Sequence, residues 1–252
     1  MDKIKEAYGD YYKGLESAIG GDERFRWVDD VLLKGVSGKE VLDVGCGEGS
    51  LLRMLRDKGN RVFGIDASDT GRKSCLAKGI DCAVIDISSE EFPFKDGSFD
   101  VVLCLETLEH LENPHHCVWE IKRVLKEGGL FIVSIPNPLI LHPYIYPGLF
   151  ELGNFKEFLR LNSFEIIKVK GWGQAEALVR LKRWLRGRKD PVSRKAAEAI
   201  HYFGRKRNLF MRKHTGTPLR WSYSINFMCV NRKKDRTLAE QLAEETCPCA
   251  GS

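Results

Sequence analysis

Five short apolar stretches, separated by segments with helical periodicity, restrict the fold of this chain more than any other feature. The apolar stretches cover residues 39–45, 61–66, 81–86, 99–106 and 130–138. The intervening segments, such as 49–59 and 114–129, place apolar residues three or four positions apart, which is typical of amphipathic helices. Strands that alternate with helices in this way form a parallel sheet with helices on both faces. The sequence therefore predicts a doubly wound α/β fold.

The remaining residues extend this core in both directions. We expect residues 1–38 to form an N-terminal helical cap and residues 39–137 to form the core. Residues 138–231 would supply a substrate-side lid, a basic helical insert and the two final strands, and residues 232–252 a polar tail. Together the strands would make a central, mostly parallel sheet of seven, with the insert placed before the last strand.

A glycine-rich stretch follows the first predicted strand. VLDVGCGEGS, residues 41–50, has glycines at positions 45, 47 and 49. This spacing differs from the G-x-G-x-x-G of dinucleotide sites, and no G-K-[ST] follows it, so neither an NAD site nor a P-loop is indicated. In an open α/β sheet, however, glycines at the end of the first strand allow a ligand to lie against the backbone. We expect a ligand site of another kind here.

The sequence DVGCGEG resembles the first motif of class I S-adenosylmethionine-dependent methyltransferases, and later segments extend the resemblance. Asp66 in GIDAS stands where that family binds the ribose hydroxyls, and Asp86 in VIDIS stands beside the adenine. FDVVLCLETLEHL and LKEGGLFIVSIPN are similar to the fourth-strand motif and to the helix, turn and strand that follow it. The resemblance implies a Rossmann-like methyltransferase fold with S-adenosyl-L-methionine as cofactor and S-adenosyl-L-homocysteine as product. It implies these cofactor-binding residues: Asp43, Gly45, Cys46, Gly47, Gly49, Asp66, Ala67, Asp86, Ile87, Cys104 and Leu105.

Residues 39–137 resemble two groups within that family. CLETLEHLENP is similar to the ubiquinone-pathway O-methyltransferases, and VGCGEGSLLRMLRDKG to the methionine-biosynthesis W-type proteins. The first group implies methyl transfer to a small-molecule acceptor, at oxygen, with an anionic or lipid-bearing acceptor. The second leaves open a non-catalytic partner of a biosynthetic enzyme that binds the same cofactor. CLET also replaces the D/N-P-P-[FYW] sequence of enzymes that methylate bases or amides at nitrogen.

Two of these residues have simpler interpretations. Asp43 could brace the glycine loop as well as bind the cofactor amine through water. Cys46 is better explained as a small space-filling residue than as a nucleophile.

His110 is the candidate general base, which a protonated hydroxyl acceptor would require. Glu106 precedes it by four residues, so in a helix the two side chains would share a face and the carboxylate would fix the imidazole tautomer. The alternative is that His110 only closes the pocket by packing. Glu106, Glu109 and His110 could also hold a divalent ion, but we predict no metal. His142 could line the acceptor side.

The net charge of the chain is unevenly distributed. Residues 177–213 contain thirteen Lys and Arg against Asp190 and Glu198, a net charge of +11 within a total of +5. The amphipathic stretch around Trp184 could lie on an anionic membrane surface, and the basic residues could equally follow RNA or a protein substrate. A lid with solvated charges is the simplest role.

The eight cysteines include no CxxC pair, and we expect them to be reduced. Cys247 and Cys249 in the polar tail could bind metal or form a labile bridge, but an unstructured tail is the simpler interpretation. No apolar run approaches the roughly 18 residues of a membrane-spanning helix, and the first residues lack the apolar core of a signal peptide. We therefore expect a soluble cytoplasmic protein.

Overall fold

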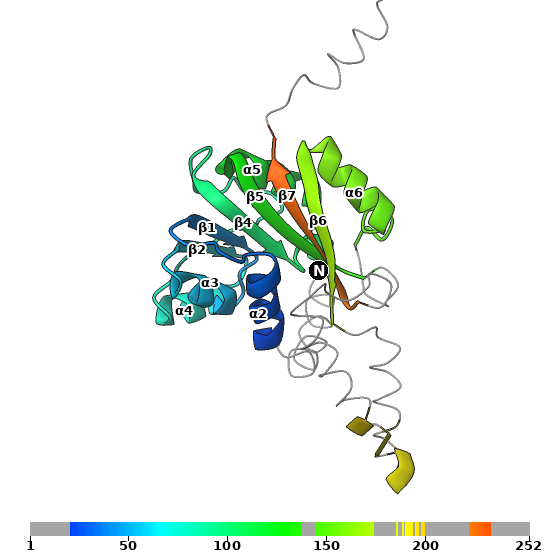
Figure 1. The fold of residues 1–252 in the computed structure, drawn as a ribbon. Helices are drawn as coiled ribbons and strands as arrows, with labels where there is room; N and C mark the ends of the chain where they lie inside the picture. Colours follow the sequence, from blue (N-terminus) through cyan, green and yellow to red (C-terminus); the bar gives the residue numbers. More distant parts are fainter. Residues whose placement is uncertain are drawn as a thin grey trace, which may run out of the picture.

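The computed structural model describes residues 21–137, 145–173, 222–232 and isolated positions between 185 and 199. Its centre is a seven-stranded sheet in the order β3-β2-β1-β4-β5-β7-β6 (Figure 1). The strands are β1 Glu40–Val44, β2 Arg61–Asp66, β3 Asp81–Val84, β4 Phe99–Leu105, β5 Leu125–Pro136, β6 Phe164–Trp172 and β7 Ser224–Asn231. β1 to β5 pair in parallel, whereas β7 runs antiparallel to both β5 and β6. The predicted mostly parallel, seven-stranded sheet is confirmed.

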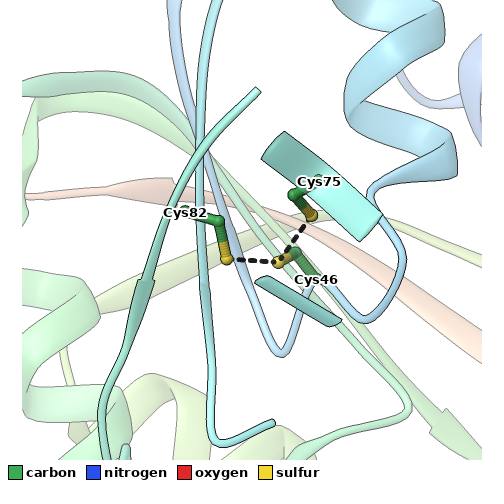
Figure 2. A group of neighbouring side chains, drawn as sticks. All are labelled: Cys46, Cys75 and Cys82. Atoms are coloured by element: carbon green, nitrogen blue, oxygen red, sulfur yellow. Dashed lines mark hydrogen bonds between the residues drawn. The ribbon is translucent and has the colours of Figure 1, made fainter. Parts of the chain in front are cut away.

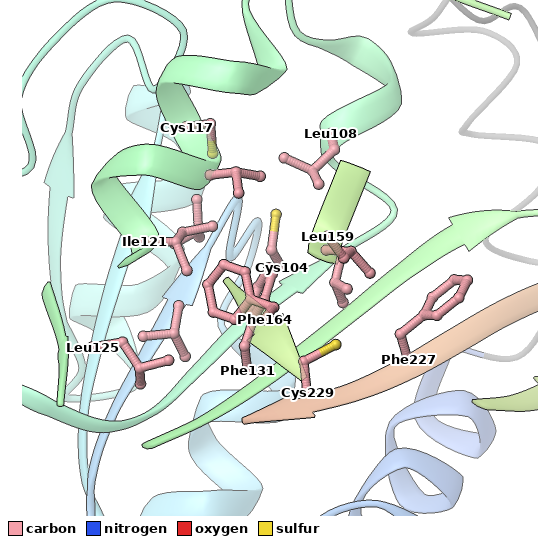
Figure 3. Packing of buried hydrophobic residues seen from close by; sticks show 14 of the residues in the cluster. Cys104, Leu108, Cys117, Ile121, Leu125, Phe131, Leu159, Phe164, Phe227 and Cys229 are labelled. Carbon is pink, nitrogen blue, oxygen red and sulfur yellow. The ribbon is translucent and has the colours of Figure 1, made fainter. Parts of the chain in front are cut away.

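Helices cover both faces of the sheet, as predicted. They are α2 Gly21–Val31, α3 Ser50–Arg56, α4 Asp69–Ala77, the short 3-10 helix η1 Leu108–His110, α5 Pro114–Val124 and α6 Leu152–Leu161. One buried cluster joins α5 and α6 to the sheet (Figure 3), and a second joins α2, α3 and α4 to the opposite face. β4 illustrates the reason, because Val101 and Leu103 belong to the second cluster while Val102 and Cys104 belong to the first. Successive side chains of a strand point to opposite faces.

Two element boundaries differ from those expected, the ends of α5 and β3. α5 ends at Val124 instead of at the glycines near 129, because β5 already begins at Leu125 and its start pairs with Phe99. β3 ends at Val84, two residues before Asp86.

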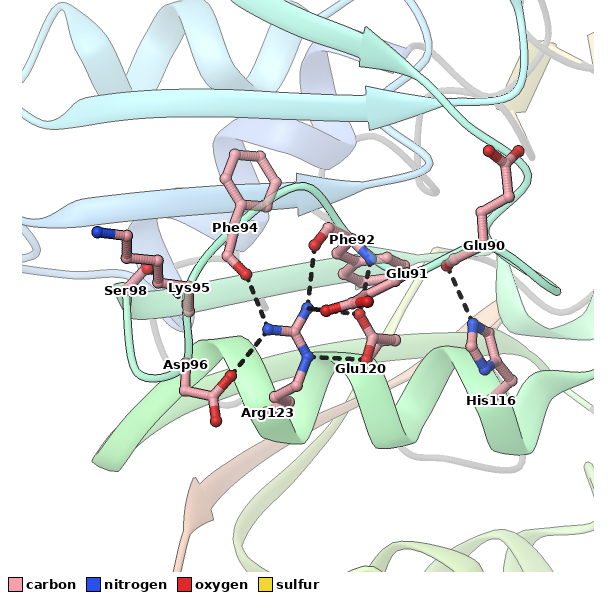
Figure 4. Close-up of polar contacts among 10 residues, drawn as sticks. All are labelled: Glu90, Glu91, Phe92, Phe94, Lys95, Asp96, Ser98, His116, Glu120 and Arg123. Carbon is pink, nitrogen blue, oxygen red and sulfur yellow. Dashed lines mark hydrogen bonds and ion pairs between the residues drawn. The ribbon is translucent and has the colours of Figure 1, made fainter.

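A buried ion pair attaches the loop before β4 to α5 (Figure 4). Arg123 bonds the carboxylate of Glu120 at 2.7 Å and donates to the carbonyl oxygens of Phe92 and Phe94 at 2.9 and 2.8 Å. Glu120 in turn accepts the N–H of Phe92 at 2.6 Å. Burial would raise the pKa of Glu120, but the bonds from Arg123 and Phe92 outweigh it and lower that pKa. The loop that leads into β4 is therefore held by charge-assisted bonds.

His115 and His116 lie in the first turn of α5, which begins at Pro114. His115 packs edge-on against Phe158 of α6 with ring centroids 4.9 Å apart, and a ring nitrogen of His116 lies 3.0 Å from the carbonyl oxygen of Glu90.

Several expectations concern residues outside the described ranges. They are the first part of the N-terminal cap, His142, most of the basic insert, and the tail with Cys247 and Cys249. Among the described residues, no helix combines the length and apolar character that crossing a membrane requires.

Candidate functional site

The glycine loop leaves the carboxyl end of β1 and enters α3. Gly45, Gly47 and Gly49 have φ values of 75°, 52° and 72°, a backbone region that favours glycine. A Cβ atom at Gly45 would lie 2.5 Å from the side chain of Thr107, which follows β4. The glycines therefore allow both the turn and the close approach of the β4 loop.

Asp66 joins this loop to the start of α4. Its Oδ2 accepts the N–H of Gly47 at 2.8 Å, and its Oδ1 accepts the N–H of Ser68 at 2.8 Å. The carboxylate, which is half-buried, thus lies at the carboxyl end of β2 against the glycine loop, with the exposed Ala67 beside it. This is a suitable position for binding two ligand hydroxyl groups, because a carboxylate has about four acceptor sites.

Asp86 and Ile87 follow β3. Asp86 is exposed and its carboxylate caps its own turn, accepting the N–H of Ser88 at 2.9 Å and the hydroxyl of Ser89 at 2.8 Å. The side chain of Ile87 is 4% exposed and packs in the core. The expected contact of these residues with adenine stays a prediction.

At the end of β4, the side chain of Cys104 is fully buried in the cluster under α5, whereas Leu105 is half-buried (Figure 3). Burial, and after it the neighbouring Cys117, raises the pKa of the Cys104 thiol. A contact between Cys104 and a cofactor would therefore have to come from its backbone.

Asp43 lies within β1, just before the glycine loop, and is 6% exposed. Burial and then the charge of Asp66 raise the pKa of Asp43 to about 8, while Arg24 acts in the opposite direction. At neutral pH, therefore, this carboxyl group is largely protonated.

The thiol of Cys46 points toward Cys75 of α4 and Cys82 of β3 (Figure 2). Burial is the main cause that raises the pKa of Cys46 far above its usual value, and it raises the pKa of Cys82 to about 11. Protonated thiols are poor nucleophiles. The space-filling interpretation of Cys46 therefore fits this geometry better than a nucleophilic one.

The structure does not bring Glu106 and His110 together on one helical face, and their catalytic roles stay predictions. Glu106 follows β4 with φ 52°, and its Oε1 accepts the hydroxyls of Ser224 at 2.8 Å and Ser134 at 3.1 Å. The guanidinium of Arg24 lies 3.3 Å from the same oxygen. No regular helix connects residues 106 and 110, since only η1, residues 108–110, intervenes, so the two side chains do not share a helical face.

The carboxylate near His110 is that of Glu109. His110 Nε2 lies 3.7 Å from Glu109 Oε1, and Glu109 is fully buried. Among the described residues, no hydrogen-bond donor reaches either of its carboxylate oxygens. Burial, and then the charge of Glu106, raises the pKa of Glu109 well above its usual value. Burial therefore favours the neutral form of Glu109.

Glu106, Glu109 and His110 do not form a ready metal site. In the described part of the chain, the one group of three or more metal-binding side chains whose ligand atoms lie within 4.8 Å of one another is Cys46, Cys75 and Cys82. Glu106, Glu109 and His110 are not such a group.

A family model described as a methyltransferase domain matches residues 42–133. Over 119 residues the chain is 35% identical to a ubiquinone biosynthesis O-methyltransferase of Pseudomonas aeruginosa strain UCBPP-PA14, and this alignment covers 45% of this chain and 50% of that protein. Over 107 residues it is 35% identical to a probable S-adenosylmethionine-dependent methyltransferase of Mycolicibacterium smegmatis, and that alignment covers 42% of each chain. The residues that match this family model run from β1 to β5 and include the glycine loop described above. Residues 42–133 are a class I S-adenosylmethionine-dependent methyltransferase domain.

Solved structures share the fold of this methyltransferase domain and its flanking elements. A TehB-like methyltransferase of Corynebacterium glutamicum has a TM-score of 0.57 at 16% identity, covering 92% of this chain and 100% of its own. An S-adenosylmethionine-dependent methyltransferase of Mesorhizobium loti has a TM-score of 0.55 at 16% identity, covering 79% and 94%. The chain spans only about half the length of the sequence relatives it matches. Similarity beyond the domain therefore concerns the fold.

The sequence analysis missed the polar group around Glu106, directly after β4. Arg24 comes from α2, Ser134 from β5 and Ser224 from the start of β7, and all three bond Glu106 or lie in its ion pair. Ser134 and Ser224 read as ordinary strand residues in the sequence. Their side chains meet because Pro136 pairs with Ser224 where β5 ends and β7 begins.

Proposed function

We propose that this chain transfers the methyl group of S-adenosylmethionine to a small-molecule acceptor, at oxygen. The observation that carries the proposal is the glycine loop closed by Asp66, at the carboxyl edge of a sheet whose domain belongs to the class I methyltransferases. The relatives named as ubiquinone biosynthesis O-methyltransferases support an oxygen acceptor.

The residues around the loop suit the cofactor. Backbone without side chains at Gly45, Gly47 and Gly49 would accommodate its methionine end, and Asp66 would bind the ribose hydroxyls with the acceptor sites that Gly47 and Ser68 leave open. When bound, S-adenosylmethionine supplies an electrophilic methyl group next to a neutral leaving thioether. The main task of the protein is then to align the acceptor, which is worth up to about 7–11 kcal/mol.

His110 is the residue we propose as general base for a hydroxyl acceptor. The Oε1 atom of Glu109 lies 3.7 Å from its Nε2 without a hydrogen bond, where the spacing led us to expect Glu106. Because burial raises the pKa of Glu109 and favours its neutral form, we expect this residue to pack beside the imidazole and not to activate it. Glu106, bonded to Ser134 and Ser224, would position the segment that leads to His110.

A cavity of about 730 Å³, lined by residues 112–115 and 145–149, begins two residues after η1 and has room for a small acceptor. Its walls include His115 at the start of α5 and the partly exposed Ile145 and Tyr146. The N–H of Ile145 donates to the carbonyl oxygen of Glu109 at 3.4 Å, which places one wall beside η1. The volume lies within the roughly 300–1,000 Å³ of small-molecule sites.

The charge of residues 177–213 supports a second element of the proposal, a peripheral contact with an anionic partner. An anionic or lipid-bearing acceptor at a membrane surface would use this charge, and RNA or protein as the acceptor is the alternative. A steep loss of activity with salt on RNA, without one on a soluble phenol, would favour RNA.

The described cysteines are free thiols, which agrees with our proposal of a cytoplasmic location.

The first test is thermal unfolding with and without S-adenosylhomocysteine. At about 100 times Kd the ligand should add roughly 2.7 kcal/mol, or about 5–10 °C in Tm. Asp66→Asn should remove this shift, while Asp81→Asn, at an exposed position on β3, should keep it. No shift in the unmodified protein would refute cofactor binding.

The second test is a methyl-transfer assay with phenols and catechols that carry or lack an isoprenoid chain. His110→Ala should lower kcat by at least about 100-fold on a hydroxyl acceptor, with the cofactor-induced Tm shift intact. A cofactor shift with no transfer to any acceptor would favour the non-catalytic alternative, and equal turnover of His110→Ala would rule out the base.

A further inference from the structure

Three cysteine thiols converge behind the glycine loop (Figure 2). The Sγ atom of Cys46 lies 3.9 Å from that of Cys75 and 3.6 Å from that of Cys82. The three residues come from different elements: the loop between β1 and α3, helix α4 and strand β3. Neither the proposed methyl transfer nor the fold of the sheet requires three sulfur atoms at this place.

Two glycines make room for these sulfur atoms. A Cβ atom at Gly64 would lie 2.6 Å from the Sγ of Cys46, and a Cβ at Gly49 would lie 2.7 Å from the Sγ of Cys75. Gly64 also pairs with Cys82 across β2 and β3, and the Sγ atoms of Cys46 and Cys82 lie 3.6 Å apart. The missing side chains at Gly64 and Gly49 therefore leave the space that the sulfur atoms of Cys46 and Cys75 occupy.

The spacing of the sulfur atoms matches that of thiolates around one metal ion. With metal–sulfur bonds of about 2.3 Å and tetrahedral or trigonal angles, sulfur ligands lie about 3.8–4.0 Å apart. The two measured distances are 3.6 and 3.9 Å, and all three sulfur atoms lie within 4.8 Å of one another. Thiolate sets of this kind select soft cations such as Cu⁺ and Zn²⁺ over Mg²⁺ or Ca²⁺.

The site has an oxygen beside it. Cys75 is buried, whereas Cys46 and Cys82 are each half-buried. The carbonyl oxygen of Gly47 lies 3.5 Å from the Sγ of Cys75 and 3.8 Å from that of Cys46. Zinc with three protein ligands keeps a fourth position for oxygen.

We propose that Cys46, Cys75 and Cys82 form a three-thiolate site for a soft cation, Zn²⁺ or Cu⁺, that ties the glycine loop to α4 and β3. Binding replaces up to three S–H protons with one ion and releases those protons to the solvent. The ion itself changes no oxidation state. The site stands beside the cofactor loop but its occupation does not depend on methyl transfer.

The test is metal binding by the full-length, reduced protein. Co²⁺ serves as a coloured probe of the Zn²⁺ arm, and Cu⁺ is titrated without oxygen against a chromophoric chelator. We expect one ion per chain, proton release into a weakly buffered solution, and a Tm rise of about 5–10 °C at roughly 100 times Kd. Thiolate-to-cobalt absorption should accompany Co²⁺ binding.

The cysteines elsewhere in the chain provide the controls. Cys82→Ala, on the edge strand β3, should weaken binding at least tenfold, and Cys46→Ala should do the same. Cys229→Ala, a buried cysteine of β7, and the tail double variant Cys247→Ser/Cys249→Ser should bind normally. Folding of each variant is checked by its Tm without metal.

The outcomes separate this proposal from the proposed function. Binding that survives in Cys82→Ala and disappears in the tail variant would assign the metal to the tail and overturn the proposal. No binding above that of the Cys46→Ala/Cys82→Ala double variant would show that the thiols only pack. Neither result involves S-adenosylhomocysteine, whose binding is measured separately.

Discussion

Asp43 offers the sharpest prediction about the cofactor site. Burial and the charge of Asp66 raise its pKa to about 8, so only about a tenth of the carboxyl groups are ionised at pH 7. S-adenosylmethionine and S-adenosylhomocysteine both carry an ammonium group. If that cation favours ionised Asp43, the binding-competent form of the protein is the minor one at neutral pH.

The size of the effect follows from the population of that form. With a pKa of about 8, selective binding to ionised Asp43 weakens the apparent affinity about 11-fold at pH 7, about 100-fold at pH 6 and about twofold at pH 8. Binding should therefore tighten about 50-fold between pH 6 and pH 8. About 0.9 proton should leave the complex per ligand at pH 7.

Titration calorimetry of S-adenosylhomocysteine measures both quantities. The pH series gives the affinity, and buffers with different ionisation enthalpies give the protons released. Asp43→Asn lacks the ionisable group but keeps its shape, so it reports the titration of the ligand amine alone. The ratio of the two pH profiles isolates Asp43.

Two results would refute the reasoning. One is a pair of parallel pH profiles for the unmodified protein and Asp43→Asn. The other is ligand binding at pH 7 without a proton release that the variant lacks. Either would mean that Asp43 braces the loop and does not sense the cofactor charge.

Four further predictions concern stability. Arg123→Ala should lower the free energy of unfolding by about 3–5 kcal/mol, because it leaves the buried Glu120 carboxylate without its ion-pair partner. The double variant Arg123→Ala/Glu120→Gln should recover part of this loss, and denaturant midpoints that show no recovery would contradict the prediction. Since its pKa is lowered, Glu120 should stabilise the native state near neutrality and lose that contribution as pH falls below about 4.5 through the folded pKa. Gly45→Ala should lower Tm more than Gly128→Ala, which has a similar φ of 73° but open space around it, and equal losses would mean that Thr107 yields. Glu109→Gln should flatten the pH dependence of the free energy of unfolding above about pH 4.5, because the native state loses up to about 1.4 kcal/mol per pH unit from there up to the raised pKa of Glu109. Identical slopes for the two proteins would refute the raised pKa.

Local patterns in the sequence were sufficient for the type of most elements. The apolar runs and the helical periodicity predicted five parallel strands and their helices, because burial on one face or two leaves a direct trace in the residue order. The glycine spacing and Asp66 likewise indicated the ligand edge of the sheet, since the loop follows its strand immediately. Boundaries such as the end of α5 at Val124 were less accurate, because pairing with a distant strand sets them.

The partners of individual side chains were decided by the tertiary structure alone. Spacing suggested Glu106 with His110, but Arg24 and Ser224, 82 and 118 positions away, hold Glu106 instead. Cys46 and Cys82 likewise meet only because Gly64 of β2 lies opposite Cys82 of β3. Sequence periodicity records which face of an element is buried, whereas a polar or sulfur contact depends on the strand order and register that bring remote segments together.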